Sequence, residues 1–301
     1  PERIQMRQKS IITMIFSILL LIKFACSEKT SNSNLEKFSS VTITDSLERE
    51  IQFTEPPQRI VAFDSAAVEI LFSIGEEKRI VGTHDFVTFP PETASIPKVG
   101  DAFNMNLESV IELNPDLVFV FTASHVEDLE KAGLKVLYIE SRQSGLQNIS
   151  QDILMWGKIV GSESQATAIS KEFDEKIVSI KNKISSNNQN FSVFQDIGGL
   201  WTPGNDILMN DAFILLKLSN LAVDLSGYQQ INPETIVERN PDIILANDVS
   251  VFKSNSSFSN LSAITDGKII ELNDDSLSIA GPRFIDGVEN MAKVIYPEIF
   301  E

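Results

Sequence analysis

The chain contains one pattern twice, as "NLESVIELNPDLVFV" from Asn106 to Val120 and as "NPETIVERNPDIILA" from Asn232 to Ala246. The two copies align without gaps, so that Glu108 corresponds to Glu234. Each copy begins with a helix pattern, passes through Asn-Pro-Asp and continues as an apolar run typical of a buried strand. Because proline disfavours helical geometry in the residue before it, the helix must end at this triplet. Solenoid repeats are about 20–50 residues long, so copies this far apart indicate two related lobes.

Strand and helix patterns alternate on both sides of the chain's middle. Apolar runs such as "RIVAF" and "FSVFQDI" are typical of buried strands, and "SAAVEILFSIG" is typical of a helix. Residues 163–186 differ, because their apolar side chains recur every three or four residues over a long stretch without a strand pattern. We therefore predict an α/β fold of two lobes, residues 41–162 and 187–301. Each lobe has a central, largely parallel sheet flanked by helices, and one long linking α-helix over residues 163–186 joins them.

Three local features complete the predicted chain path. The stretches "GGLWTPG" and "LSGYQQ" are rich in glycine and are predicted to be loops. The last helix is predicted to begin at about Pro282, because the first turn of a helix does not need the missing proline N–H. The two Asn-Pro-Asp triplets are predicted to be structural turns from helix into strand.

The N-terminal segment has the features of an export signal. Basic residues precede an apolar run from Ile11 to Ile22 that is too short to span a bilayer comfortably. We predict a signal peptide over residues 1–25, with Met6 as its start, and a polar tether over residues 26–40. The protein is therefore expected in the periplasm or on the outer face of the cytoplasmic membrane.

The only cysteine, Cys26, directly follows this signal. A lone thiol in an exported protein needs an explanation, and lipid attachment to Cys26 supplies one, with anchoring to the membrane as its consequence. Ala25 fits the small residue that bacterial lipoproteins carry before the cysteine. Lys23 and Phe24 do not fit their pattern, so ordinary cleavage near this point is the alternative.

Composition and motifs exclude several classes of function. The chain has 25 basic and 42 acidic residues and a net charge of −17, which argues against nucleic acid as a partner. It lacks the glycine-rich phosphate and dinucleotide motifs and the Gly-x-Ser-x-Gly nucleophile motif. Its two histidines form no His-Glu-x-x-His pair. We therefore predict that the protein is not an enzyme and holds no cofactor or resident metal of its own.

Six blocks in order carry a resemblance to a known family. They are "VTITDSLEREIQF…PQRIVAFDSAAVEILFSIGEEKRIVG", "FPPE", "KVG", the two repeat copies and "AGPRFIDGVENMAKVIYPEIF". From about Val41 to Phe300 the chain resembles the class III substrate-binding proteins of ABC importers for vitamin B12 and ferric siderophores. This resemblance implies two lobes, a linking helix, a ligand in the cleft between the lobes, and a permease dimer with its ATPase as the partner.

The chain departs from the family pattern at two turns. Family hairpins often carry glycine where Glu48 stands, and the turn from strand to helix is often Ser-Pro where this chain has Asp64 and Ser65. The first difference concerns only the hairpin. The second changes the floor of the expected cleft, and with it the ligand that the cleft accepts.

The resemblance also assigns a role to the repeated glutamates. In the family, each lobe presents one glutamate that meets an arginine pocket on one copy of the permease, and Glu108 and Glu234 occupy these positions. An arginine–carboxylate contact is directional as well as electrostatic, which suits docking. The alternative is that both glutamates only stabilise helix starts, where the helix dipole favours negative charge.

The expected cleft is lined by loops that follow strands, where open α/β sheets bind their ligands. Aromatic side chains in these loops suit a large, flat or partly apolar ligand. The candidate ligand-binding residues are His84, Phe86, Phe103, Trp201, Tyr228 and Arg283.

Each candidate has an alternative role. The aromatic side chains could pack beneath their own loops. His84 could coordinate the metal of a ligand or serve as an ordinary hydrogen-bonding residue. Arg283 could pair with a ligand carboxylate or with a neighbouring acid such as Asp286.

The favoured ligand is a transported metal chelate, either a ferric siderophore or cobalamin. Haem and the free ions Zn²⁺ and Mn²⁺ are the alternatives. The free ions are less favoured because zinc sites prefer nitrogen and sulfur ligands, and the chain offers only His84 and His125.

Overall fold

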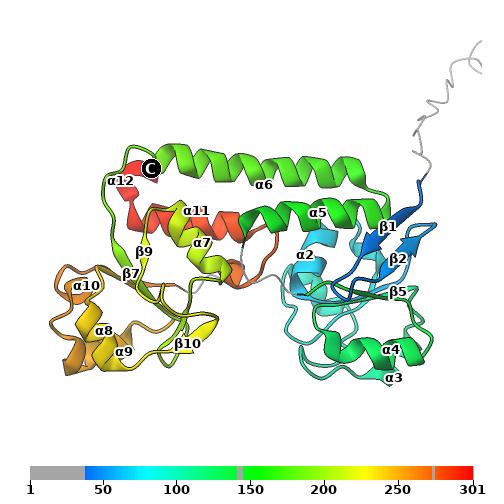
Figure 1. Ribbon diagram of the computed structural model, residues 1–301, viewed down its shortest axis with the longest axis horizontal. Coiled ribbons are helices and arrows are strands. Elements are labelled where there is room, and N and C mark those ends of the chain that lie inside the picture. The colour runs from blue at the N-terminus through cyan, green and yellow to red at the C-terminus, as the bar shows by residue number, and fades with distance from the viewer. Residues whose placement is uncertain (1–37, 141–144, 273–274, 301) are drawn as a thin grey trace, which may run out of the picture. The chain divides into compact units, whose positions relative to one another are not determined.

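The computed structural model describes residues 38–140, 145–272 and 275–300. The predicted signal peptide, Cys26 and most of the tether lie outside the described residues. The described residues belong to one compact unit, Phe38–Glu301, which Figure 1 shows with its helices and strands labelled.

The N-terminal lobe is built on a four-stranded parallel sheet in the order β4-β3-β5-β6. The strands are β3 (Ile60–Phe63), β4 (Ile80–Gly82), β5 (Leu117–Val120) and β6 (Val136–Tyr138). The helices of this lobe are α2 (Ser65–Ser73), α3 (Leu107–Glu112), α4 (Val126–Lys131) and α5 (Leu146–Val160). An antiparallel hairpin of β1 (Val41–Thr44) and β2 (Glu50–Phe53) precedes the sheet.

The C-terminal lobe has a second four-stranded parallel sheet in the order β12-β11-β7-β9. Its strands are β7 (Ser192–Asp196), β9 (Ser219–Asn220), β11 (Ile243–Ala246) and β12 (Ile269–Glu271). Its helices are α7 (Leu208–Leu215), α8 (Pro233–Arg239), α9 (Ser250–Ser254), α10 (Ser262–Thr265), α11 (Phe284–Ile295) and α12 (Pro297–Phe300). Short 3-10 helices span Glu77–Arg79, Pro91–Ser95, Ala123–His125, Ser256–Phe258 and Asp275–Ser278.

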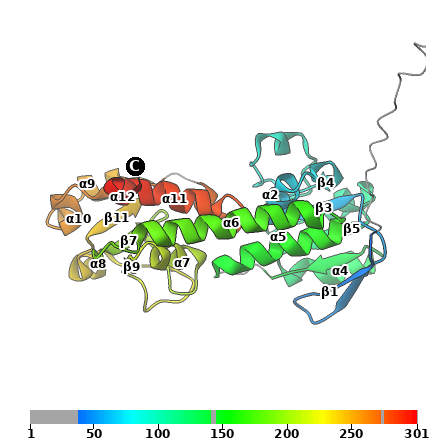
Figure 2. The same cartoon turned by 90° about the horizontal axis from the view of Figure 1, so that it is seen from above.

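The linking helix α6 (Glu163–Ile184) packs along α5 of the N-terminal lobe and against α7, α11 and α12 of the C-terminal lobe. Figures 1 and 2 show α6 running past both lobes. Its buried Phe173 and Ile180 belong to one apolar core that extends from β3 to α12. The predicted fold of two lobes with parallel sheets and a linking helix is confirmed, and a shared core holds the lobes to that helix.

Each sheet is buried on both faces, which explains the continuous apolar runs in the sequence. In β3, Ile60 and Ala62 face the shared core, whereas Val61 and Phe63 face a second core within the N-terminal lobe. In β11, Ile243 and Leu245 alternate in the same way with Ile244 and Ala246, which face a separate core of the C-terminal lobe.

The Asn-Pro-Asp triplets form equivalent turns in the two lobes. Asn114 and Asn240 have φ angles of 44° and 43°, a left-handed conformation that asparagine tolerates better than most residues. The carboxylate of Asp116 accepts the N–H groups of Gln58 and Arg59, and the carboxylate of Asp242 accepts the N–H group of Ser192. Each triplet therefore ends a helix and fixes the segment that enters the neighbouring strand.

Four details of the chain path add to the prediction or correct it. The helix α5 lies in a stretch for which only the absence of strands was expected. The last helix begins at Phe284 rather than at Pro282, because Arg283 occupies its N-cap position. Glu48 has a φ of 61°, which accounts for the glycine that related hairpins often carry there. The stretches predicted to be loops around residues 201 and 228 contain short strands, β8 (Trp201–Pro203) and β10 (Tyr228–Gln230), which pair antiparallel.

Candidate functional site

The candidate site lies at the carboxyl ends of the parallel strands, where each strand is followed by a loop or a helix. Asp64 directly follows β3, and its carboxylate accepts the N–H of Ala67 at 2.7 Å as the N-cap of α2. Burial raises the pKa of Asp64. The departure from the usual Ser-Pro turn therefore has a local structural role, since Asp64 starts the helix at the floor of the site.

His84 is buried beside this floor, with only 4% of its surface exposed. Its Nε2 lies 3.4 Å from the hydroxyl of Ser65, and its ring meets the edge of Phe63 at a centroid distance of 5.4 Å. Its Nδ1 is buried and has no hydrogen-bond partner among the described residues. Burial, together with the charge of Lys98, lowers the pKa of His84 to about 4. The imidazole is therefore neutral at pH 7, the form that a metal ligand requires.

The second histidine lies on the same phenylalanine. His125 meets Phe63 at a centroid distance of 5.6 Å, and its buried Nε2 also has no partner among the described residues. Burial lowers the pKa of His125. The two histidines, distant in the sequence, thus flank one aromatic ring in the N-terminal lobe.

Phe86 and Phe103 are exposed on loops of the N-terminal lobe, with 61% and 78% of their surfaces accessible. The ring of Phe86 lies 6.3 Å from that of His84. The loop before Phe103 is fixed by Asp101, whose carboxylate accepts the N–H groups of Phe103 and Asn104. Neither phenylalanine packs beneath its own loop.

Trp201 and Tyr228 lie together on the antiparallel ribbon of β8 and β10. Trp201 is paired with Gln230, and Tyr228 is paired with Pro203. Because alternate residues of a strand point to one face, Trp201 and Tyr228 are diagonal neighbours on the same face. They are 44% and 46% exposed, whereas Thr202 between the paired positions is fully buried. The ribbon thus presents two aromatic rings outward, and Thr202 on its other face packs inward.

Arg283 bridges the two lobes through acids that sequence reasoning did not identify. Its Nε lies 2.9 Å from Oε1 of Glu69 in α2, and its Nη1 lies 2.7 Å from Oδ1 of Asp275. The guanidinium also lies 3.9 Å from the ring centre of Phe89. Asp286, the acid expected as its alternative partner, pairs instead with Lys176. Since Nη2 also donates to Oδ2 of Asp275 at 3.2 Å, all three guanidinium nitrogens of Arg283 have partners within the protein.

Glu69 is the residue of this group that the sequence could have revealed. It is the single charged residue in the apolar helix α2 and is only 5% exposed. Its Oε2 has no hydrogen-bond partner among the described residues. Burial outweighs the effect of Arg283 and raises the pKa of Glu69 to about 7. An isolated acid in an otherwise apolar helix is a usable signal for a buried ion pair.

Two cavities share this ion pair in their lining. A cavity of about 120 Å³ is lined by Ser65, Phe86, Asp275 and Arg283, among others, and so joins candidate residues of both lobes. A cavity of about 770 Å³ opens between α2, α6 and α11 and contains Arg283 as its only predicted ligand residue. Phe103, Trp201 and Tyr228 line neither cavity. The larger hollow is therefore not the site that the sequence predicts.

The two repeated glutamates lie in equivalent positions on the two lobes. Glu108 is in the first turn of α3, and Glu234 is in the first turn of α8. Both side chains are exposed, and neither forms an ion pair with another described residue. Figure 1 places α3 and α8 on the side of the molecule away from α6. These positions are open to a partner that approaches both lobes from one side.

Residues 38–140, 145–272 and 275–300 contain neither a metal-binding cluster nor a membrane-spanning helix. No group of three or more His, Cys, Asp and Glu side chains there is placed to hold a metal ion. No helix there is long and apolar enough to cross a membrane.

Comparison with known proteins places the chain among solute-binding proteins. The family model described as "Periplasmic binding protein" matches residues 60–276. The ABC transporter substrate-binding lipoprotein YvrC of Bacillus subtilis, itself uncharacterized, is 31% identical over 275 residues that cover 87% of each chain. The cobalamin-binding protein of Halobacterium salinarum is 22% identical and covers 85% of this chain and 74% of its own.

A solved structure shares the fold across the lobes. The molybdate periplasmic binding protein MolA of Haemophilus influenzae superposes with a TM-score of 0.75 at 20% identity, over 86% of this chain and 92% of its own. Proteins named for cobalamin and for molybdate thus resemble the same chain. This fold does not by itself determine the ligand.

Proposed function

The chain belongs to the periplasmic binding protein family as the substrate-binding protein of an ABC transporter, and we propose that it captures a metal chelate between its lobes. The proposed chelate is a ferric siderophore or cobalamin, which the protein delivers to the permease. The protein is a solute carrier and not an enzyme, as predicted. Its working partners are therefore a permease dimer and the ATPase that drives it.

The observation that carries this proposal is the set of exposed aromatic rings that both lobes present. Phe86, Phe103, Trp201 and Tyr228 are each at least 40% exposed, and they come from both lobes. Exposed aromatic side chains at the loops of a binding fold provide apolar contact area for a ligand with a large, partly apolar surface. A metal chelate has such a surface, whereas a free metal ion needs a compact set of donor atoms. The resemblance to a cobalamin-binding protein supports the same ligand class.

In this proposal His84 supplies the contact to the metal of the chelate. Its unpaired Nδ1 is buried, and the ring is held neutral by its low pKa. A neutral imidazole can complete the coordination of cobalt or iron in a chelate that leaves one position open. This role requires a rotation of the ring or of the loop that covers it, since Nδ1 has no exposed surface.

The test is a titration of tryptophan fluorescence. The chain has two tryptophans, of which Trp156 is 1% exposed and Trp201 is 44% exposed. A Trp156→Phe variant therefore reports on Trp201 alone. Cyanocobalamin and a panel of ferric siderophores should quench this signal with saturation, and haemin, ZnCl₂ and MnCl₂ serve as competing candidates.

Saturable quenching by a chelate, absent with the free ions, supports the proposal. Binding of ZnCl₂ or MnCl₂ without a chelate would overturn it, and binding of haemin alone would move the assignment to haem. A Trp201→Phe variant that keeps Trp156 is the control for optical effects, because its remaining buried tryptophan records light absorption by the added ligand.

We further propose that Cys26 is lipidated and anchors the protein at the outer face of the cytoplasmic membrane. Support comes from its position after the apolar segment and from the relative described as a lipoprotein. Labelling of cells with a fatty acid analogue should mark the wild-type protein and not a Cys26→Ser variant. Release of unlabelled wild-type protein into the soluble fraction would contradict this proposal.

A further inference from the structure

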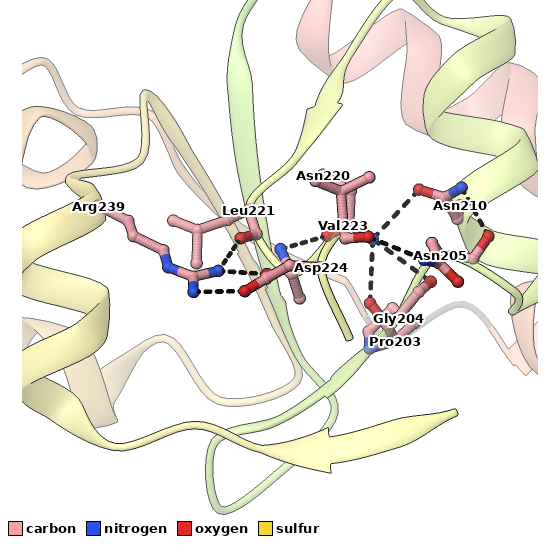
Figure 3. A network of polar contacts seen from close by, with 10 residues as sticks. Pro203, Gly204, Asn205, Asn210, Asn220, Leu221, Val223, Asp224 and Arg239 are labelled. Atoms are coloured by element: carbon pink, nitrogen blue, oxygen red, sulfur yellow. Dashed lines mark hydrogen bonds and ion pairs between the residues drawn. The ribbon is translucent and has the colours of Figure 1, made fainter. Parts of the chain in front are cut away.

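The ribbon that carries Trp201 and Tyr228 is held by a buried asparagine at the edge of the C-terminal sheet. Asn220, the last residue of β9, is 7% exposed. Its Nδ2 donates to the carbonyl of Pro203 at 3.0 Å, and its Oδ1 accepts the N–H of Ala222 at 2.9 Å. Pro203 ends β8 and is paired with Tyr228. One amide group therefore fixes the end of the ribbon to the sheet (Figure 3).

Further hydrogen bonds hold the segment after β8 against the segment before β10. The N–H of Gly204 donates to Gly227, and the N–H of Asn205 donates to Leu225. The side chain of Asn205 donates to Val223 at 2.9 Å. The two segments that support the aromatic rings are thus joined to each other as well as to β9.

Gly204 lies where no side chain fits. A Cβ atom at this position would lie 2.4 Å from the carbonyl oxygen of Leu225. Such a distance is well inside van der Waals contact, so only glycine permits the close approach of the two backbones. The packing of the ribbon against its support is therefore tight as well as hydrogen-bonded.

The segment that follows β9 is tied to α8, the helix whose first turn carries the candidate docking residue Glu234. Arg239, the last residue of α8, donates through Nη1 to the carbonyl of Leu221 at 2.6 Å. It also forms a two-pronged pair with Asp224, with distances of 2.7 and 2.8 Å. Leu221 directly follows Asn220, and Asp224 lies four positions after it. Figure 3 shows these groups in one network.

We propose that Asn220 is a positioning residue for the aromatic pair and that Arg239 and Asp224 connect this support to the docking helix α8. The buried amide of Asn220 donates to Pro203 and Asn210 and accepts from Ala222, so any displacement of Pro203 or Ala222 leaves a buried polar group unpaired. The two-pronged Arg239 contact resists rotation of α8 relative to the same segment. A shift of α8 on docking would therefore be transmitted to Trp201 and Tyr228.

The consequence for transport rests on the proposed function, but the positioning itself can be measured without a ligand. In the Trp156→Phe background, Trp201 is the only tryptophan. Asn220→Ala should increase collisional quenching of Trp201 by acrylamide and decrease its fluorescence anisotropy. Asn255→Ala is the matched control, because Asn255 caps a short helix elsewhere in the same lobe.

A conservative variant keeps the test decisive if Asn220→Ala does not fold. Asn220→Asp retains the acceptor for the N–H of Ala222 and loses the donor to Pro203, so it should also loosen Trp201. Unchanged quenching in folded Asn220→Asp would overturn the positioning role. Far-UV circular dichroism establishes folding in each variant.

The link to α8 has its own test. Arg239→Gln and Asp224→Asn should each increase the quenching of Trp201, and the double variant should add little to either single change, since both remove the same pair. Val237→Ala, an exposed residue of the same helix, is the control. Quenching that responds to Asn220 variants and not to Arg239→Gln would overturn the link while leaving the positioning role intact.

Titration with cyanocobalamin and ferric siderophores then separates this inference from the proposed function. The Asn220 variants should lose about 5- to 30-fold in affinity for whichever probe the wild type binds, the factor that corresponds to one or two kcal/mol. If the wild type binds no chelate but Trp201 still loosens, the proposed ligand is wrong and the positioning role stands. If the wild type binds a chelate and no variant changes the quenching of Trp201, the proposed ligand stands and the positioning role is wrong.

Discussion

Trp201 and Tyr228, the two exposed aromatic residues of the β8–β10 ribbon, are the residues whose substitution tests ligand binding at the proposed site. Trp201→Ala and Tyr228→Ala should each weaken binding of the chelate by about 1–3 kcal/mol, as is usual when a central aromatic contact is truncated. Isothermal titration calorimetry with the chelate that quenches Trp201 measures the change for both variants. Val294→Ala, at an exposed position of α11, is the control. Wild-type affinity in both folded aromatic variants would show that the rings are not ligand contacts.

His84 should make stability depend on pH. Its folded pKa of about 4 lies below its ordinary value of 6.5, so between these values the unfolded chain binds a proton that the native state does not. The free energy of unfolding should therefore fall as the pH is lowered from 6.5 to 4, with a slope of up to about 1.4 kcal/mol per pH unit from this group.

His84→Gln removes this contribution and should flatten the profile in urea titrations between pH 4 and pH 7. The groups whose charges act on His84 are Lys98, Asp85 and Asp101, and all three remain in the variant. Glu69 acts in the opposite direction, so the comparison must be between wild type and variant. Parallel profiles would contradict the neutral, buried state of His84.

At the scale of elements, the helices α3 and α8 present Glu108 and Glu234 at their first turns. Glu108→Ala and Glu234→Ala should leave the affinity for the chelate unchanged, because both side chains are exposed on helices outside the aromatic cluster. If they dock the permease as the family resemblance implies, each substitution should weaken docking, because the arginine expected on the transporter would then lack its partner. The loss of docking free energy should be on the order of 2–5 kcal/mol if the glutamate–arginine pair is desolvated, and far smaller if the pair lies at a solvent-exposed rim of the interface.

The chain offers matched controls for this experiment. Glu112 and Glu238 are exposed acids at the opposite ends of the same two helices. Their alanine variants remove the same charge without touching the first turn, so they should dock normally in a pull-down with permease in detergent or nanodiscs. If the Glu108 and Glu234 variants dock normally but lose chelate binding, these residues contact the ligand and the docking role is wrong.

At the scale of the whole molecule, the pair of Glu69 and Arg283 connects α2 of one lobe to the start of α11 in the other. Removing one partner of a buried ion pair costs about 3–5 kcal/mol, because the other charge remains buried. Arg283→Ala should therefore destabilise the protein and loosen the contact between the lobes. Thermal unfolding followed by circular dichroism measures the loss.

The pH dependence identifies the cause of that loss. Burial already raises the pKa of Glu69 to about 7 from an ordinary 4.5, so stability from the protonated form is lost as the pH rises through this interval. Without Arg283 the pKa rises further, and the destabilisation by Arg283→Ala should be larger at pH 8 than at pH 5. Glu69→Gln in the same chain should recover part of the stability at pH 8. Equal losses at both pH values would show that packing on Phe89, and not charge, explains the effect.

Several features of the protein follow from the sequence because they depend on short-range geometry. The repeat with its Asn-Pro-Asp turns, the apolar strands and the linking helix over Glu163–Ile184 all result from local backbone restrictions and hydrophobic periodicity. These features are sufficient to define two lobes. The positions of Glu108 and Glu234 at helix starts follow from the same patterns.

Other features were decided only by the tertiary structure, because they depend on contacts between distant segments. Arg283 pairs with Glu69, which is 214 residues away, rather than with the nearby Asp286. Trp201 and Tyr228 share a face only because their stretches pair as strands, and glycine-rich segments show no hydrophobic alternation that would reveal this. The burial that shifts the pKa of His84 likewise arises from the packing of Phe63 and its neighbours. The local sequence pattern determines the path of the backbone. Which residues pair with one another, and how far burial shifts a pKa, depend on which distant segments pack together and exclude water, so only the folded chain decides them.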